Sequence, residues 1–372
     1  MRRGRLRWAG LAVVALLVAG CAGEEGGIAA PPDWTPAATP AEPTGSAASG
    51  GQSGGRVGPL TPLEVRTLAT VRRLDDHPLY EMTYSGPMPA ALPRAADAAP
   101  PDPAGASPSP LRRPFGCTVF LAAGDPARPV VGRNFDWDAN PALLLRTDPP
   151  GGPATVSLVD ISYLGYDRAH LADLATPEGR RGLLRAPLLP FDGMNSHGLM
   201  VGMAADEAGV AARRPDRTVV GSVRIMRLVL DRARTVRDAV AVLDRYDLDF
   251  SGGPPLHYLV ADRTGASAIV EFVGGRMRVF PRGPQPWQVM VNFQQAASTP
   301  ASRQADRRWR TATARLAAAG GRLDPPTALT LLRDVRQGHT QWSVAYDLRG
   351  QRALLVTSQD YGRVREVAVP GS

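Results

Sequence analysis

The chain has 372 residues, of which 44% are hydrophobic and 21% charged, with a formal net charge of +8 at pH 7. This length and composition suit one large globular domain with extensions. The charge does not indicate a nucleic-acid partner: four arginines lie in a leader that we expect to be removed, which lowers +8 to +4, and the others are scattered among Asp and Glu without a basic stripe.

Residues 1–21 have the pattern of an export signal. Four arginines precede an apolar run, residues 9–20, which is too short to span a bilayer about 30 Å thick. The run ends in VAGC, which resembles the lipobox of bacterial lipoproteins, and this resemblance implies that Cys21 is acylated and becomes the mature N-terminus. It implies an extracytoplasmic protein, lipid-anchored to the bacterial cell membrane. An ordinary signal peptide with an incidental cysteine is the alternative.

Two segments of different composition follow this leader. Residues 22–57 are rich in Gly, Ala, Ser, Pro and Thr and predict a disordered tether. Residues 58–116 predict a propeptide or small-subunit segment that ends in a Pro/Ala-rich loop. Within it, Thr61 and Glu64 have the spacing of a helix capping box, and the apolar spacing predicts a helix that ends at His77-Pro78. The sequence LYEMTY then predicts a strand.

Residues 117–372 predict one large folded domain. Short β-branched segments bounded by Gly, Pro or Asp, such as ALLLRT, ATVSLVDI and SAIVEFV, predict strands, several of them in hairpins. Helical periodicity interrupts them at residues 222–245, 303–318 and 326–336. Runs of strands with helices grouped between them favour an α+β class, with two layers of antiparallel sheet covered by helices.

Cys117 is one of only two cysteines. If Cys21 carries lipid, Cys117 has no disulfide partner, and the five histidines show no zinc-ligand spacing. A thiol with a pKa of ~8.5 needs a base to become a nucleophile, and cutting the chain after Gly116 would supply one, because an α-amino group has a pKa of ~7.7–8.0. A small buried structural cysteine is the other reading.

The motifs around Cys117 resemble a known family. GCTVF, followed by GRNFDW, is similar to the N-terminal-nucleophile (Ntn) choloylglycine hydrolase family of linear amide C–N hydrolases, which includes bile salt hydrolases, penicillin V acylases and acid ceramidase-like amidases. The resemblance continues through FDGMNSHGL, PLHYLVADRTGASAIVEF, VMVNFQ, ADRRWRTA and TQWSVAYDLRGQRALLV. It implies an Ntn-hydrolase fold, a four-layer αββα sandwich with two antiparallel sheets. We expect no cofactor and no metal.

The resemblance also implies roles for individual residues. Cys117 would be the nucleophile, Asp136 would hold its freed α-amino group, and Arg133 would bias the thiol toward thiolate. Asn292 would donate to the developing oxyanion, a contribution of about 3 kcal/mol. Because residues three apart on a strand face opposite sides, Arg133 and Asp136 can both approach Cys117 only if a bend or bulge lies near residues 134–135.

The resemblance also bears on two further positions. Arg307 would be the distal arginine that supports the site, with Arg303 as the alternative. Bile salt hydrolases end the strand after the GMNxxGL segment with an asparagine, whereas this chain has Ala205 there, followed by Asp206. Ceramidase-like members carry an acidic residue at that point, so Asp206 is a candidate oxyanion or substrate residue.

The sequence therefore predicts an enzyme that cleaves itself between Gly116 and Cys117. It would then hydrolyse small-molecule N-acyl amides with an apolar acyl group through a thioester. The 22–116 fragment would either stay bound or leave. An acyltransferase that uses the same acyl-enzyme, and a non-catalytic lipoprotein binding module on the same fold, are the alternatives.

Overall fold

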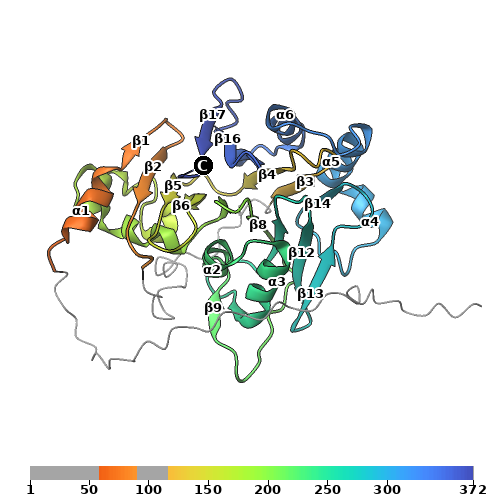
Figure 1. Ribbon diagram of the computed structural model, residues 1–372, viewed down its shortest axis with the longest axis horizontal. Coiled ribbons are helices and arrows are strands. Elements are labelled where there is room, and N and C mark those ends of the chain that lie inside the picture. Colours follow the sequence, from red (N-terminus) through yellow and green to blue (C-terminus); the bar gives the residue numbers. More distant parts are fainter. Residues whose placement is uncertain (1–57, 90–115, 372) are drawn as a thin grey trace, which may run out of the picture. The chain divides into compact units, whose positions relative to one another are not determined.

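The computed structural model describes residues 58–89 and 116–371 (Figure 1). The predicted signal peptide with Cys21 and the predicted tether 22–57 lie outside the described residues, as does most of the predicted loop after residue 89.

The larger sheet has nine strands in the order β1-β2-β5-β6-β7-β8-β11-β12-β13. Its neighbouring strands are antiparallel except for β2 and β5, which are parallel. The strands are β1 (Arg72–Arg73), β2 (Leu79–Tyr84), β5 (Ala142–Thr147), β6 (Thr155–Asp160), β7 (Asp192–Asn195), β8 (Met200–Ala205), β11 (Leu256–Ala261), β12 (Ser267–Val273) and β13 (Arg276–Pro281).

The second sheet has six strands, all antiparallel, in the order β14-β3-β4-β15-β16-β17. They are β3 (Thr118–Ala122), β4 (Val130–Asp136), β14 (Trp287–Met290), β15 (Thr340–Asp347), β16 (Arg352–Thr357) and β17 (Arg365–Ala368). A separate parallel pair joins β9 (Val219–Gly221) to β10 (Asp247–Asp249). Strands β3 and β4 lie inside the six-stranded sheet and are fully buried, and β4 buries the polar residues Arg133, Asn134 and Asp136 along with its apolar ones.

Helices cover the outer face of each sheet (Figure 1). Helices α2 (Arg224–Arg232) and α3 (Val236–Arg245) pack on strands of the nine-stranded sheet, whereas α5 (Arg307–Ala318) and α6 (Pro325–Val335) pack on the six-stranded sheet. Strand β3 contacts β8 and β11, so the two sheets face each other between the helices. This arrangement confirms the predicted α+β class and the four-layer αββα sandwich of Ntn hydrolases.

The segment upstream of Cys117 is part of this fold. Helix α1 (Pro62–Ala69) begins with the predicted capping box, in which the Thr61 side chain accepts from the Glu64 backbone N–H and the Glu64 carboxylate accepts from that of Thr61. The predicted strand LYEMTY is β2, at Leu79–Tyr84. The helix ends earlier than predicted, because the chain after Thr70 extends as β1 and pairs with β2.

Two predicted helical stretches are each divided by a local cap. Residues 222–245 form α2 and α3, because Thr235 and Asp238 make a capping box that starts a second helix. Residues 303–318 cover the end of α4 (Pro300–Ala305) and all of α5, which starts where the Asp306 side chain accepts from the Trp309 backbone N–H. The remaining short helices are 3₁₀ turns: η2 (Ile161–Leu164), η3 (Leu171–Ala175) and η4 (Gly179–Leu188).

Candidate active site

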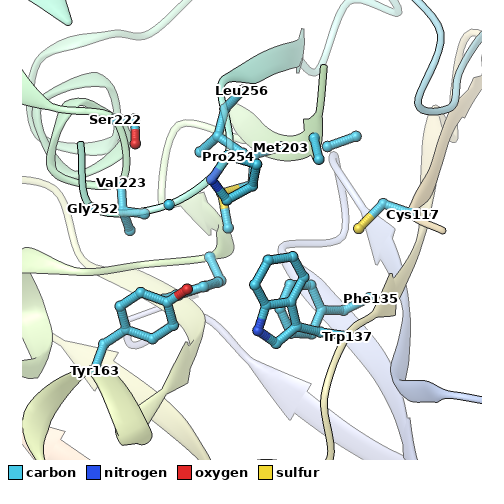
Figure 2. A pocket seen from close by; sticks show the side chains of 14 residues that line it. Cys117, Phe135, Trp137, Tyr163, Met203, Ser222, Val223, Gly252, Pro254 and Leu256 are labelled. Atoms are coloured by element: carbon cyan, nitrogen blue, oxygen red, sulfur yellow. The ribbon is translucent and has the colours of Figure 1, made fainter. Parts of the chain in front are cut away.

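The candidate nucleophile Cys117 stands immediately before β3. It is a free cysteine whose residue is only 3% exposed. Its sulfur points into a pocket between the two sheets (Figure 2). The thiol is therefore shielded from bulk water but faces an internal space, the placement that a nucleophile requires and that a packed core cysteine lacks.

The pocket walls are mainly apolar. The cavity has a volume of about 40 Å³. Phe135 stacks on Trp137 with centroids 6.2 Å apart, and Phe191 contacts both Phe135 and Tyr163 edge-on at 5.6 and 5.1 Å. The lining residues besides Cys117 are Phe135, Trp137, Tyr163, Phe191, Met203, Ala204, Ala205, Ser222, Val223, Gly252, Gly253, Pro254 and Leu256. Such walls favour an apolar group beside the sulfur.

Strand β4 carries both Arg133 and Asp136, and a register irregularity lies beside it in the neighbouring strand. Thr340 of β15 pairs with Asp136, but Trp342 pairs with Phe135, so Gln341 is an extra residue on the neighbouring strand. The sequence analysis expected a bend near residues 134–135, and the register shift falls beside Phe135, although the additional residue belongs to β15.

Arg133 is fully buried next to the thiol. Its guanidinium lies 5.1 Å above the Phe135 ring centroid, and its Nε is 3.5 Å from Oδ2 of Asp192. Burial by itself would lower the pKa of Arg133, but Cys117, Asp192 and Asp136 outweigh it and raise that pKa. The guanidinium charge of Arg133 therefore lies beside the sulfur of Cys117.

Asp192 is a site residue that the sequence analysis did not name. Its carboxylate is fully buried, accepts from Trp342 Nε1 at 2.9 Å and from the Tyr346 hydroxyl, and forms the ion pair with Arg133. It fixes Arg133 against Cys117. The only sequence signal was its place in the FDGMNSHGL motif, because a single aspartate in a short strand otherwise resembles a turn residue.

Asp136 combines one satisfied and one unsatisfied carboxylate oxygen. Its Oδ1 accepts from the Thr340 hydroxyl, whereas the buried Oδ2 has no hydrogen-bond partner among the described residues. Burial raises the pKa of Asp136 to about 7. Its Cβ would be 3.2 Å from a Cβ atom built on Gly116, so the carboxyl group adjoins the Gly116–Cys117 backbone.

Arg308 joins Cys117 to Asn292. One guanidinium nitrogen, Nη1, donates to the Cys117 carbonyl oxygen at 2.7 Å and to Asn292 Oδ1 at 2.8 Å, while Nη2 donates to Asp306 at 3.0 Å. With its oxygen held by Arg308, the Asn292 amide presents its nitrogen toward the Ala205 carbonyl, 2.9 Å away. Asn292 thus has a fixed donor direction, which a preformed oxyanion site needs.

The contacts do not support the predicted role of Arg307. The Arg307 guanidinium donates to the carbonyl oxygens of Asp334 and Arg336, both at 3.1 Å, and lies on the exposed side of α5. Arg303, the alternative, lies on α4 and makes no hydrogen bond to Cys117 or Asn292. Successive residues of a helix point about 100° apart, so only one of the two neighbouring arginines of α5 faces the site, and it is Arg308.

Asp206 lies away from the sulfur. Its buried carboxylate accepts from Gln294 Nε2 at 2.9 Å and lines a second cavity of about 410 Å³. Asn292 also lines that cavity, and Ala205 lines both cavities. Asp206 therefore lines the second cavity and not the apolar pocket.

No group of three or more His, Cys, Asp or Glu side chains in residues 58–89 and 116–371 could hold a metal ion. Over the same ranges, no helix has the length and apolar character needed to cross a membrane.

Among the comparisons with known proteins, the match to a family model begins at the candidate nucleophile. The model of the family described as linear amide C–N hydrolases, choloylglycine hydrolase family, matches residues 117–296. An uncharacterized protein of Paramecium bursaria Chlorella virus 1 is 24% identical over 173 residues, which are 44% of this chain. These residues are 52% of the viral protein, so the chain spans about half the length of the curated relative it matches.

Similar solved structures include penicillin V acylase from Agrobacterium tumefaciens, with 17% identity, a TM-score of 0.48, and coverage of 68% of this chain and 86% of that one. A mutant conjugated bile acid hydrolase from Clostridium perfringens has 15% identity, a TM-score of 0.49, and coverage of 68% and 92%. The family match begins at the candidate nucleophile and runs through Arg133, Asp136 and Asn292. Over residues 117–296 the chain is similar to the choloylglycine hydrolase family of linear amide C–N hydrolases.

Proposed function

We propose that this protein hydrolyses linear amides after cleaving its own chain between Gly116 and Cys117. The observation that carries the proposal is the pairing of two features at one backbone position. The Cys117 sulfur faces an apolar pocket, and an unpartnered carboxylate oxygen of Asp136 is buried beside the bond to be cut.

Freeing the α-amino group of Cys117 would complete the site. The new ammonium or amine group would lie next to Asp136, whose Oδ2 lacks a hydrogen bond in the uncut chain. A buried carboxylate without a partner costs free energy, and an adjacent amine removes that cost. Cleavage therefore produces both a base for the thiol and the partner that Asp136 lacks.

Turnover would then follow the chemistry of an N-terminal cysteine. The amine takes the thiol proton, and the sulfur attacks the amide carbonyl of the substrate. Asn292, oriented by Arg308, donates to the oxyanion. When the tetrahedral intermediate collapses, the C–N bond breaks, the leaving nitrogen takes the proton, and a thioester remains. Water attacks the thioester and releases the acid.

The pocket supports an apolar acyl group. Aromatic and aliphatic side chains surround the sulfur, so the acyl half of the substrate gains burial there, at about 25 cal/mol per Å². Fatty-acid amides, N-acyl-homoserine lactones, phenoxyacetyl amides and conjugated bile acids are the candidate substrates.

We also propose the cellular placement that the sequence implies. Acylation of Cys21 would anchor the enzyme to the outer side of the bacterial cell membrane, where the residues that follow would act as a tether. The test is metabolic labelling with a fatty acid, compared between the wild type and Cys21→Ala. Label that persists in Cys21→Ala would contradict the anchor.

The decisive test of self-cleavage is the intact mass of purified protein. We expect the wild type to yield a fragment that begins at Cys117, and the Cys117→Ala variant to stay uncut. A panel of N-acyl amides then tests turnover by product analysis. A wild type that keeps its Gly116–Cys117 bond while hydrolysing amides at full rate would overturn the mechanism.

A further inference from the structure

Gln337 contacts the carbonyl group that self-cleavage must attack. It lies in the turn between α6 and β15, and its Nε2 is 3.5 Å from the Gly116 carbonyl oxygen. This is the carbonyl of the Gly116–Cys117 peptide bond itself. A distance of 3.5 Å is long for a ground-state hydrogen bond, but donors to a developing oxyanion shorten their contacts in the transition state.

The identity of residue 116 fits this contact. A Cβ atom at Gly116 would lie 2.3 Å from Gln337 Nε2 and 3.0 Å from its Cδ. Any larger residue would push the amide away from the carbonyl. Glycine therefore permits the close approach of a side-chain donor to the scissile bond, which is a distinct reason for its presence here.

Gln337 is also held in place by its backbone. Its N–H donates to the Thr340 hydroxyl at 2.9 Å, and its carbonyl oxygen accepts from Thr340 N at 3.2 Å and from Gln359 Nε2 at 3.0 Å. The same Thr340 hydroxyl donates to Asp136. One turn thus fixes the positions of the Gln337 amide and the Asp136 carboxylate on the two sides of Gly116.

We propose that Gln337 is a catalytic residue of self-cleavage, which donates a hydrogen bond to the oxyanion that forms on Gly116. The inference rests on the proposed function. It separates two oxyanion sites: Gln337 serves the carbonyl of Gly116, whereas Asn292 serves the carbonyl of a substrate. Arg308 does not compete for the first role, because it donates to the Cys117 carbonyl, on the other side of the scissile nitrogen.

The step balances without any further reagent. The Cys117 thiol passes its proton to Asp136, the sulfur bonds to the Gly116 carbonyl carbon, and the C=O electron pair moves to the oxygen beside Gln337. Collapse breaks the C–N bond, and the nitrogen takes the proton back from Asp136. The product is a thioester with a free α-amino group, and water releases Gly116 as a carboxylate while restoring the thiol.

The experiment follows the rate of appearance of the fragment that begins at Cys117 in full-length protein. Gln337→Leu removes the donor, and we expect cleavage about 10² to 10³ times slower than in the wild type. Gln337→Glu keeps the shape but offers a carboxylate at neutral pH, and we expect a similar loss there. Near pH 4.5 part of that carboxyl group is protonated and can donate, so its rate relative to the wild type should rise, while that of Gln337→Leu should not.

Gln341→Leu is the matched control. Gln341 is a neighbouring glutamine whose Nε2 donates to the carbonyls of Trp137 and His339, not to Gly116. We expect it to cleave at close to the wild-type rate, because its side chain donates to carbonyl oxygens that take no part in the cleavage. Thermal unfolding of each variant shows whether it is folded, and if the leucine variant is not, the pH response of Gln337→Glu decides the question.

The outcomes separate the two proposals. If the wild type forms the Cys117 fragment and both Gln337 variants form it at the wild-type rate, the role of Gln337 is wrong and self-cleavage stands. If the wild type forms no such fragment, the proposed function fails, and this inference fails with it. Slow cleavage in Gln337→Glu without relative recovery at low pH would assign Gln337 a structural role and overturn the proposal.

Discussion

Strands β2 and β3 stand on the two sides of residues 90–115, and they enter different sheets. Strand β2 pairs in parallel with β5 in the nine-stranded sheet, whereas β3 lies between β14 and β4 in the six-stranded sheet. Around β2, packing dominates: Leu68, Met82 and Leu143 are fully buried in one apolar cluster. Around the start of β3, buried charges dominate, with Arg133, Asp136 and Asp192 close to the thiol.

The surroundings of β2 contribute to stability, whereas those of β3 hold the reactive groups. Strand β2 takes its partners from within its own sheet, and β3 does the same, so neither ladder depends on the peptide bond between Gly116 and Cys117. Cleaving that bond would leave both sheets complete. The upstream segment therefore behaves as a packed component, while the downstream chain carries the reactive groups, and each part can be disturbed separately.

The largest effect is expected from removing the sulfur. Cys117→Ala should abolish self-cleavage and lower turnover by at least about 10⁴-fold, as loss of a nucleophile does in other enzymes. Intact mass and an amide-hydrolysis assay measure the two effects. Cys117→Ser should process slowly and turn over still more slowly. Full turnover in the alanine variant would show that the reaction does not use this residue.

The second effect concerns pH and the stability of the uncut protein. Burial raises the pKa of Asp136 to about 7, from 3.8 for an unperturbed group. Between these values the folded state holds a proton that the unfolded state has lost, so the free energy of unfolding falls as the pH rises. Three pKa units correspond to about 4 kcal/mol.

Urea denaturation of Cys117→Ala between pH 4 and pH 7 measures this slope without interference from cleavage. Adding Asp136→Asn should flatten the slope, because an amide does not titrate. If the slope in the double variant is unchanged, other groups cause the pH dependence. The raised pKa of Asp136 would then be contradicted.

Much of the fold could be predicted because its signals are local. The capping box at Thr61 and Glu64 depends on spacing within one turn, and LYEMTY and ALLLRT are β-branched or apolar runs of strand length. The parallel pairing of these two strands could not be predicted, since 57 residues separate the end of one from the start of the other and register depends on their shared core.

The site was predictable only in part, for a geometric reason. Motifs marked Cys117, Arg133 and Asp136, but the choice between adjacent arginines of α5 depends on the rotation of the helix about its axis. Asp306 sets that rotation by capping the helix. Asp192 and Gln337 act through contacts with residues at least 59 positions away in the chain, and no local pattern marks them.

The third effect concerns the segment upstream of Cys117, which contains α1 and β2. We expect the cleaved upstream fragment to stay bound, because its α1 and β2 bury Leu68 and Met82 in the shared cluster. Leu68→Ala should weaken that binding by about 3 kcal/mol, or roughly 10²-fold, as truncation of a buried leucine does. Gel filtration of cleaved protein at decreasing concentration measures it. The matched control is Val65→Ala on the same helix, where the side chain is 46% exposed. If Leu68→Ala and Val65→Ala weaken binding of the upstream fragment equally, burial of Leu68 does not hold the fragment in place.

The smallest of these effects distinguishes Arg308 from Arg307, its neighbour on α5. Arg308→Ala removes the donor to both Cys117 O and Asn292 Oδ1, so the Asn292 amide loses its fixed direction. We expect kcat/KM to fall by about 10²-fold, near the lower end of what an oxyanion donor contributes. Arg307→Ala removes only contacts to the Asp334 and Arg336 carbonyls and should stay within about threefold of the wild type.

Both arginine variants lose one positive charge from adjacent positions of α5, so a difference between them reports the buried surroundings of Arg308 rather than the net charge. Arg308→Lys refines the comparison, because lysine keeps the charge but lacks the forked donor geometry that reaches two acceptors at once. A lysine variant that resembles alanine would indicate orientation of Asn292 as the main role. A larger loss in Arg307→Ala than in Arg308→Ala would reverse the assignment, and the inward-facing residue of α5 would then have to be sought one position earlier.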